Sequence, residues 1–96
     1  MDDLERAYEL RHSSDLARLE ARAAAALAEA TEAADIYFGL PDRGLDLANS
    51  LRLKALALDA LGRSGEAVVD WTEARRLYVD LGVAEGVAEC DTRLSR

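Results

Sequence analysis

Apolar residues recur at helical spacing along most of the chain. From Leu16 onward they form a stripe with the period of an α-helix, and this stripe ends at Gly39-Leu40-Pro41. Similar stripes follow at about 44–61, 67–81 and 83–94. Ala and Leu dominate the composition and β-branched residues are few, which also favours helices. We therefore predict an all-α fold of four or five antiparallel helices.

Small and polar residues separate the predicted helices. Asp42 follows the only proline and is a candidate turn residue. Gly62-Arg63-Ser64-Gly65 interrupts the apolar pattern, and Ser64 is a candidate N-cap for the helix that follows. Gly82 is placed to end that helix in a left-handed conformation.

The chain resembles itself at a shift of 41 residues. Thr31-Glu32-Ala33 and Ile36-Tyr37 reappear as Thr72-Glu73-Ala74 and Leu77-Tyr78, and Arg52-Leu53 aligns with Arg93-Leu94. A period of this size is typical of stacked helical hairpins, in which no unit buries its apolar face alone. Such arrays usually serve as docking surfaces, so the repeat favours a binding function over a catalytic one.

Residues 2–38 allow two interpretations. Ser13 or Ser14, in the polar segment 12–15, could start a second helix. The 41-residue alignment places a turn near residues 21–24, whereas the run of four alanines in this region favours an unbroken helix. We expect one long helix with an irregularity near residues 12–15.

The predicted helix at 44–61 is apolar on two sides. One side carries Leu47, Leu51, Leu58 and Leu61, and a roughly opposite side carries Leu45, Leu53, Leu56 and Ala60. A helix with two apolar faces must be covered on both. Its neighbours in sequence can cover one face, so the second requires another helix of the chain, a second copy, or a partner.

Residues 45–81 resemble the tetratricopeptide repeat. The resemblance rests on Ala55, Leu58, Leu61-Gly62, Glu66-Ala67, Trp71 and Ala74, with the small and aromatic residues at the family's distances from the turn glycine. It extends to 27–38 and 84–95, although Lys54 stands where the family prefers leucine and the period exceeds the usual value of about 34 residues. The resemblance implies a single domain over residues 1–96, built as a right-handed stack with a concave groove that takes a peptide.

The candidate binding residues lie on the helix expected to line that groove. They are Leu45, Asn49, Arg52, Leu53, Leu56 and Ala60. The 41-residue alignment also places Arg11, Arg52 and Arg93 in one column, and peptide-clamping members of the family carry a basic residue at the position of Arg52. Such a basic stripe would suit an acidic peptide or a terminal carboxylate. Coincidence in an arginine-rich chain is the competing explanation, and Leu56 replaces the asparagine expected nearby.

Charge and composition narrow the class of function. The formal net charge of -7 argues against nucleic-acid binding, and no apolar run approaches the length of a membrane span. The acidic start at Met1-Asp2-Asp3 does not resemble a signal peptide, and a single cysteine cannot form an internal disulfide, so we expect a cytoplasmic protein. Eleven arginines against one lysine are typical of a G+C-rich bacterial genome.

Candidates for catalysis are sparse. His12 is expected to be solvated or to cap a helix, because no partner for a general base can be named. Cys90 has no CxxC companion and falls in an apolar register, which favours a packed thiol. Trp71 and Tyr78 lie seven residues apart and are expected in the core. We expect no enzyme activity, no metal and no cofactor.

The sequence therefore predicts a non-catalytic module that binds a protein or peptide segment through a helix-lined groove, with an acidic peptide as one candidate. One alternative is a structural domain that self-associates through its second apolar face. Another is a small-molecule sensing accessory protein with a cavity beside Trp71. We expect a homo-oligomer, most simply a dimer, because the second apolar face exceeds what sequence neighbours can cover.

Overall fold

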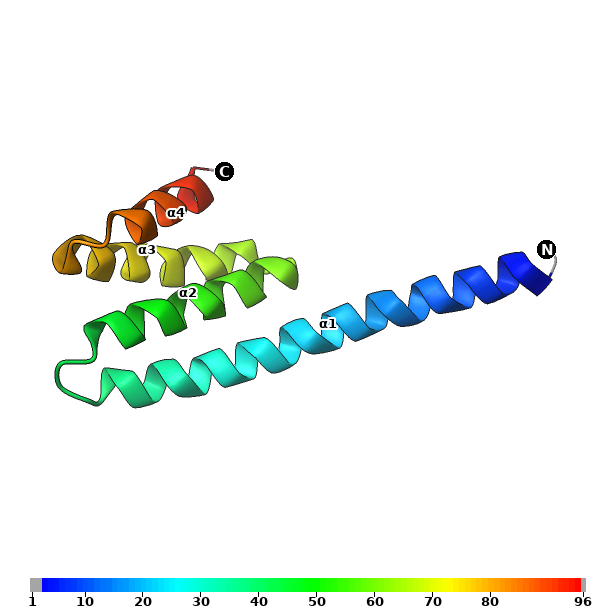
Figure 1. Ribbon diagram of the computed structural model, residues 1–96, viewed down its shortest axis with the longest axis horizontal. Helices are drawn as coiled ribbons and strands as arrows, with labels where there is room; N and C mark the ends of the chain where they lie inside the picture. The colour runs from blue at the N-terminus through cyan, green and yellow to red at the C-terminus, as the bar shows by residue number, and fades with distance from the viewer. Residues whose placement is uncertain (1–2, 96) are drawn as a thin grey trace.

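The computed structural model consists of four helices, α1 (Asp3–Phe38), α2 (Gly44–Ala60), α3 (Ser64–Leu81) and α4 (Ala84–Leu94). The structure describes the backbone of residues 3–95 and the side chains of Arg6 and of residues 19–95. The helices run alternately in opposite directions and lie in the order of the sequence, each beside the one before it (Figure 1). The predicted all-α class is confirmed.

Helix α1 is continuous from Asp3 to Phe38. The expectation of one long helix is therefore confirmed, while the expected irregularity at 12–15 is wrong, and Ser13 and Ser14 do not begin a second helix. Serine costs a helix well under 1 kcal/mol per residue, whereas a break would require a second unfavourable nucleation step.

Helix α1 is also much longer than its neighbour α2. At about 1.5 Å per residue, its 36 residues extend about 54 Å, against about 26 Å for the 17 residues of α2. The N-terminal half of α1 consequently projects beyond the other three helices (Figure 1).

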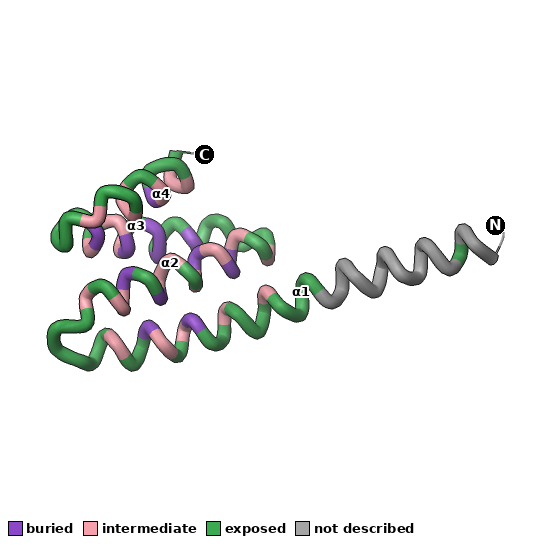
Figure 2. The backbone as a smooth tube through the Cα atoms, viewed as in Figure 1, coloured by how far each residue is buried: buried purple, intermediate pink, exposed green. Residues whose placement is uncertain are grey.

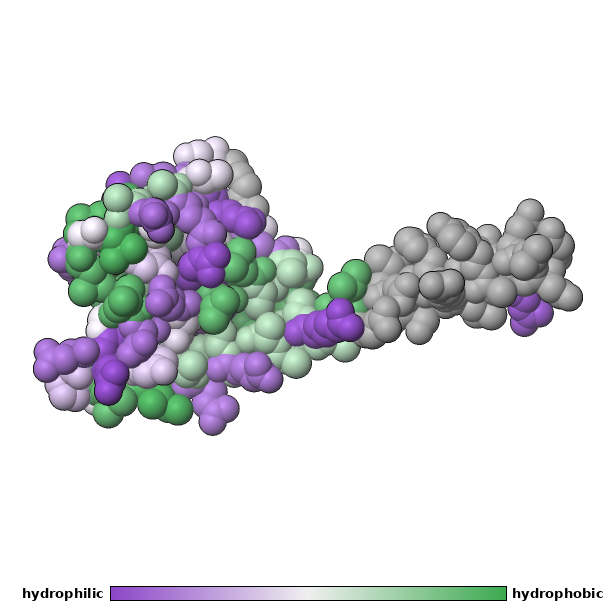
Figure 3. Space-filling model, in the orientation of Figure 1, coloured by the Kyte–Doolittle hydropathy of each residue, from purple (hydrophilic) through white to green (hydrophobic). Residues whose placement is uncertain are grey.

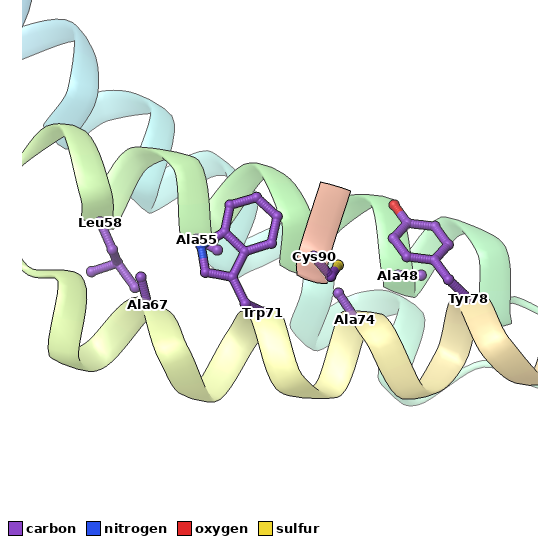
Figure 4. Close-up of a cluster of buried hydrophobic side chains, with 8 residues drawn as sticks. All are labelled: Ala48, Ala55, Leu58, Ala67, Trp71, Ala74, Tyr78 and Cys90. Atoms are coloured by element: carbon purple, nitrogen blue, oxygen red, sulfur yellow. The ribbon is translucent and has the colours of Figure 1, made fainter. Parts of the chain in front are cut away.

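The centre of the core lies between α2 and α3. Figure 4 shows the ring of Trp71 over Ala55 and the ring of Tyr78 beside Ala48, so a large side chain of α3 meets a small one of α2. Trp71 is fully buried and Tyr78 is 2% exposed. Large-on-small packing brings the two helices close together without leaving voids. The prediction that both aromatic residues belong to the core is confirmed.

Small residues also fill the remaining contacts of α3. Ala67 lies beside Leu58 of α2, and Ala74 lies beside Cys90 of α4 (Figure 4). Ala67, Ala74 and Cys90 are all fully buried. Burial raises the pKa of the Cys90 thiol, which favours the protonated form, so the prediction of a packed thiol is confirmed.

Left-handed residues separate the helices. Gly82 ends α3 with φ 72°, as predicted, and Asp42 has φ 58° in the turn between α1 and α2. The expected cap at Ser64 is wrong, because Ser64 is already the first residue of α3 and the N-cap position falls on Arg63. No side chain caps α3; the Arg63 guanidinium instead binds Glu66 in the first turn, with an Nη2–Oε1 distance of 2.9 Å.

Helix α1 packs along one edge of the second apolar side of α2. Ala30 and Ala34 of α1 are buried, and so are Ser50 and Ala57 of α2. Figure 2 shows buried positions on both helices where they lie side by side. Leu53 remains 52% exposed. The sequence analysis named three groups that could cover the second apolar side of α2. One of them, another helix of the chain, covers only its edge and leaves the remaining surface exposed.

Candidate functional site

The candidate binding residues of α2 lie along its uncovered face. A helix turns by about 100° per residue, which places all six positions within about one third of its circumference. Leu45 and Leu53 are 47% and 52% exposed, and Asn49 and Ala60 are also exposed. Leu56 is only half-buried, and it packs partly against the core. Residues of α1 line a groove on one side of this face and residues of α4 line a hollow on the other, so the face has two different borders.

The border with α1 is an apolar groove of about 530 Å³, called the α1–α2 groove below. Its lining comprises Arg22, Ala23, Ala26, Glu29, Ala30 and Ala33 of α1, with Ser50, Leu53, Leu56, Ala57 and Ala60 of α2. Figure 3 shows weakly apolar surface where α1 passes along α2, next to the point at which α1 leaves the body. The alanines make this groove shallow, so the backbone of another helix could approach it closely.

The border with α4 is a polar hollow of about 310 Å³, lined in part by Asn49 and Arg52. The Arg52 guanidinium binds the Glu89 carboxylate through two hydrogen bonds, one with an Nη2–Oε2 distance of 3.0 Å. These bonds hold the pKa of Glu89 below its ordinary value. The Tyr78 hydroxyl donates a hydrogen bond of 2.7 Å to Asn49 Oδ1. The polar groups of Asn49, Arg52, Tyr78 and Glu89 in this hollow are thus already engaged with one another.

The arginines of the proposed basic stripe are engaged with carboxylates. Arg52 pairs with Glu89, and Arg93 Nη1 lies 3.9 Å from Asp59 Oδ2. The Arg93 guanidinium also lies 5.7 Å from the centroid of the Trp71 ring, and the Trp71 indole donates a 3.0 Å hydrogen bond to the same Asp59 oxygen. An acidic peptide would have to compete with Asp59 and Glu89 for these guanidinium groups. The side chain of the third member, Arg11, lies outside the described residues.

Asp59 and Glu89 were missed in the sequence because neither shares the repeat column of the arginines. A weak signal was present for Glu89. It precedes Arg93 by one helical turn, and this spacing puts both side chains on the same face of α4. Asp59 reaches Arg93 only through the packing of α2 against α3 and α4, which no local spacing reveals.

The residues considered for catalysis do not form a site in the described part of the chain. The His12 side chain lies outside it, and Cys90 is buried. Trp71 lines neither the α1–α2 groove nor the hollow beside α4. Among the described residues, no three His, Cys, Asp or Glu side chains are grouped as metal ligands. No helix in the same part of the chain is both long and apolar enough to cross a bilayer.

Comparison with protein-family models, with curated proteins and with solved structures finds no significant match to this chain. The functional argument therefore depends on the geometry and chemistry of the uncovered α2 face.

Proposed function

We propose that this protein is a non-catalytic interaction module, built as a tetratricopeptide-like stack, that docks an α-helical segment of a protein partner in the α1–α2 groove. The observation that carries the proposal is the groove itself, an apolar channel bordered by exposed Leu53 and floored by small residues. Burying apolar surface of this kind contributes roughly 25 cal/mol per Å².

The chemistry of the groove favours a helix over an extended peptide. An extended peptide leaves its backbone N–H and C=O groups unpaired, and it is usually bound by adding a strand to a sheet edge. Residues 3–95 contain no strand that could offer such an edge. A helix satisfies its own backbone hydrogen bonds and needs only an apolar stripe that fits between α1 and α2.

The groove is supported by a rigid framework. Its α2 wall is held from behind by the buried contacts with α3, including Trp71 and Tyr78. The α1 wall is fixed by the burial of Ala30 and Ala34. A partner helix would therefore meet a preformed surface, which reduces the entropy lost on binding.

Site-specific photo-cross-linking tests this proposal. Replacing Leu53 by the photoreactive residue p-benzoylphenylalanine places the probe in the groove, and replacing Val68 provides a matched control. The two positions are 52% and 49% exposed, but Val68 lies on α3 and does not line the groove. Irradiation in extracts of the source cells should give discrete protein adducts through position 53 and not through position 68.

Mass spectrometry then identifies each adduct and distinguishes a second copy of the chain from another protein. Equal adduct patterns at the two positions, or none at position 53, would show that the groove is not a docking site.

A further inference from the structure

We propose that the helix docked in the α1–α2 groove is α1 of a second copy of this chain, which lies antiparallel about a two-fold axis near Ala26. This inference rests on the proposed function, because it names the occupant of the same groove. Three features of α1 support it: the placement of its charges, the spacing of its small residues, and its length.

The charges that border the groove are complementary to themselves. Arg22 and Glu29 both line the groove from α1, and both are exposed. Seven residues separate them, which is two helical turns or about 10.5 Å. A two-fold axis midway between them places each Arg22 opposite the partner's Glu29, so both ion pairs form at once. A parallel arrangement in register would not place these two residues opposite each other.

The apolar spacing of α1 fits a helix–helix seam. Leu19, Ala23, Ala26, Ala30 and Ala33 follow one another at intervals of four, three, four and three residues. This alternation is the heptad pattern of two packed helices, and Arg22 and Glu29 occupy equivalent positions beside the seam. Flanking residues of this type face each other in an antiparallel pair. The charge pair therefore places the axis within the stretch of α1 that carries this apolar seam.

The two-fold arrangement also provides a cover for the exposed leucines. Leu19 is 56% exposed on α1, and Leu53 is 52% exposed on α2. Antiparallel pairing about Ala26 brings the partner's Leu19 over Ala33, the small residue at the opposite end of the groove lining. A large side chain then meets small ones, as in the α2–α3 core, and Leu53 lies in the wall beside it.

The length of α1 allows both grooves to be filled. Residues Arg22 and Ala23 line the groove together with Ala60, the last residue of α2, so the axis lies near the end of the four-helix body. The part of α1 that precedes the axis projects beyond this body (Figure 1). In the pair, the projecting segment of each copy runs along the groove of the other, which gives a closed dimer with one self-complementary interface.

Charge exchange at Arg22 and Glu29 tests the axis directly. In the Arg22→Glu variant each copy carries two acidic residues at the interface, and in the Glu29→Arg variant each copy carries two basic residues. A dimer of either variant therefore places like charges opposite each other at both positions. An equimolar mixture opposes acidic and basic copies and restores both pairs. Glu32→Arg is the control, because Glu32 is exposed on α1 but does not line the groove.

Sedimentation equilibrium measures the outcome over micromolar to millimolar concentrations. The parent chain and the control should approach twice the 10.4 kDa chain mass. Each charge variant should show a dimer dissociation constant raised at least tenfold, or about 1.4 kcal/mol, and the mixture should recover dimer. Circular dichroism should report the same helix content in all of them.

A parent chain that stays at 10.4 kDa at millimolar concentration would overturn this inference. So would charge variants that dimerise like the parent, or a mixture that does not associate. If cross-linking through position 53 then captures a different protein, the proposed function stands and only the identity of the occupant is wrong. If position 53 captures nothing, both proposals fail.

Discussion

Gly86 allows the backbone of α4 to approach the aromatic core closely. A Cβ atom at this position would lie 2.5 Å from Cγ of Tyr78. The tyrosine ring is almost fully buried and its hydroxyl is bound to Asn49, so it has little freedom to move away. Glycine inside a helix costs about 1 kcal/mol relative to alanine, and the close approach of the two helices is the compensation.

We predict that Gly86→Ala destabilises the fold by about 1–3 kcal/mol, because the clash outweighs the better helix propensity of alanine. Urea denaturation followed by Trp71 fluorescence measures the change. Gly65→Ala is the matched control, since Gly65 lies in α3 with nothing within 4 Å of its added Cβ, and it should not lose stability. Equal stability of the two variants would mean that α4 does not pack against Tyr78 as described.

Glu89 links stability to pH through its bond to Arg52. Its folded-state pKa is lowered mainly by the hydrogen bonds that Arg52 donates. A carboxylate with a lowered pKa contributes stability above its unfolded pKa, and this contribution is lost as the pH falls through the folded pKa. Glu89→Gln should therefore be less stable than the parent at pH 7, by no more than about 1 kcal/mol because the pair is partly exposed.

The difference in stability between Glu89→Gln and the parent should shrink as the pH falls below 4.5, the ordinary pKa of glutamate, and should vanish once the pH has passed the lowered folded-state pKa of Glu89. Urea titrations of both proteins at pH 7 and pH 3 provide the comparison. Asp70, whose pKa is raised mainly by burial, contributes equally to the pH dependence of both proteins, so it does not affect the difference in their stability. A difference that persists unchanged at pH 3 would assign the loss to packing rather than to charge.

At the scale of the elements, the register of α2 against α3 depends on small residues placed opposite large ones. Ala48 and Ala55 receive the two aromatic rings of α3, and Ala67 receives Leu58 (Figure 4). Shifting either helix by one residue would move each large side chain away from the small residue on which it packs. The register is therefore specified by side-chain volume as well as by the apolar stripe.

Ala74→Leu tests this dependence on volume. Ala74 is fully buried beside Cys90, so three added carbons would overpack the junction of α3 and α4 and cost about 1–3 kcal/mol. Ala25→Leu makes the same exchange at an exposed position of α1 outside the groove lining, and its melting temperature should stay near that of the parent. Thermal melts by circular dichroism that coincide for the two variants would refute the assigned contact.

At the scale of the whole molecule, the projecting half of α1 dominates the shape. The radius of gyration is 17.1 Å, whereas a compact chain of this length has a value of about 12.5 Å. The longest dimension is 59 Å, close to the length of α1 itself. A long helix that leaves the body beside an apolar groove is suited to association, and the cross-linking and charge-exchange experiments test this role.

The helices and their core could be predicted from the sequence because both depend on local spacing. The bounds of α2, α3 and α4, the stop at Gly82 and the burial of Trp71 follow from residues within a few turns of each other. The sequence also indicated that α2 has a second apolar side in need of a cover, because a helix apolar on two sides must be covered on both, but it left open which group supplies that cover.

Only the tertiary structure decided which groups meet across helices. Arg52 and Arg93 share a repeat column in the sequence, yet each is paired with a carboxylate far away in the chain. The α1–α2 groove likewise depends on where α1 crosses α2, and an unbroken stripe of small residues does not indicate how much of it is covered. Helical periodicity assigns each residue to a face, whereas the distance and angle between helices determine what that face contacts.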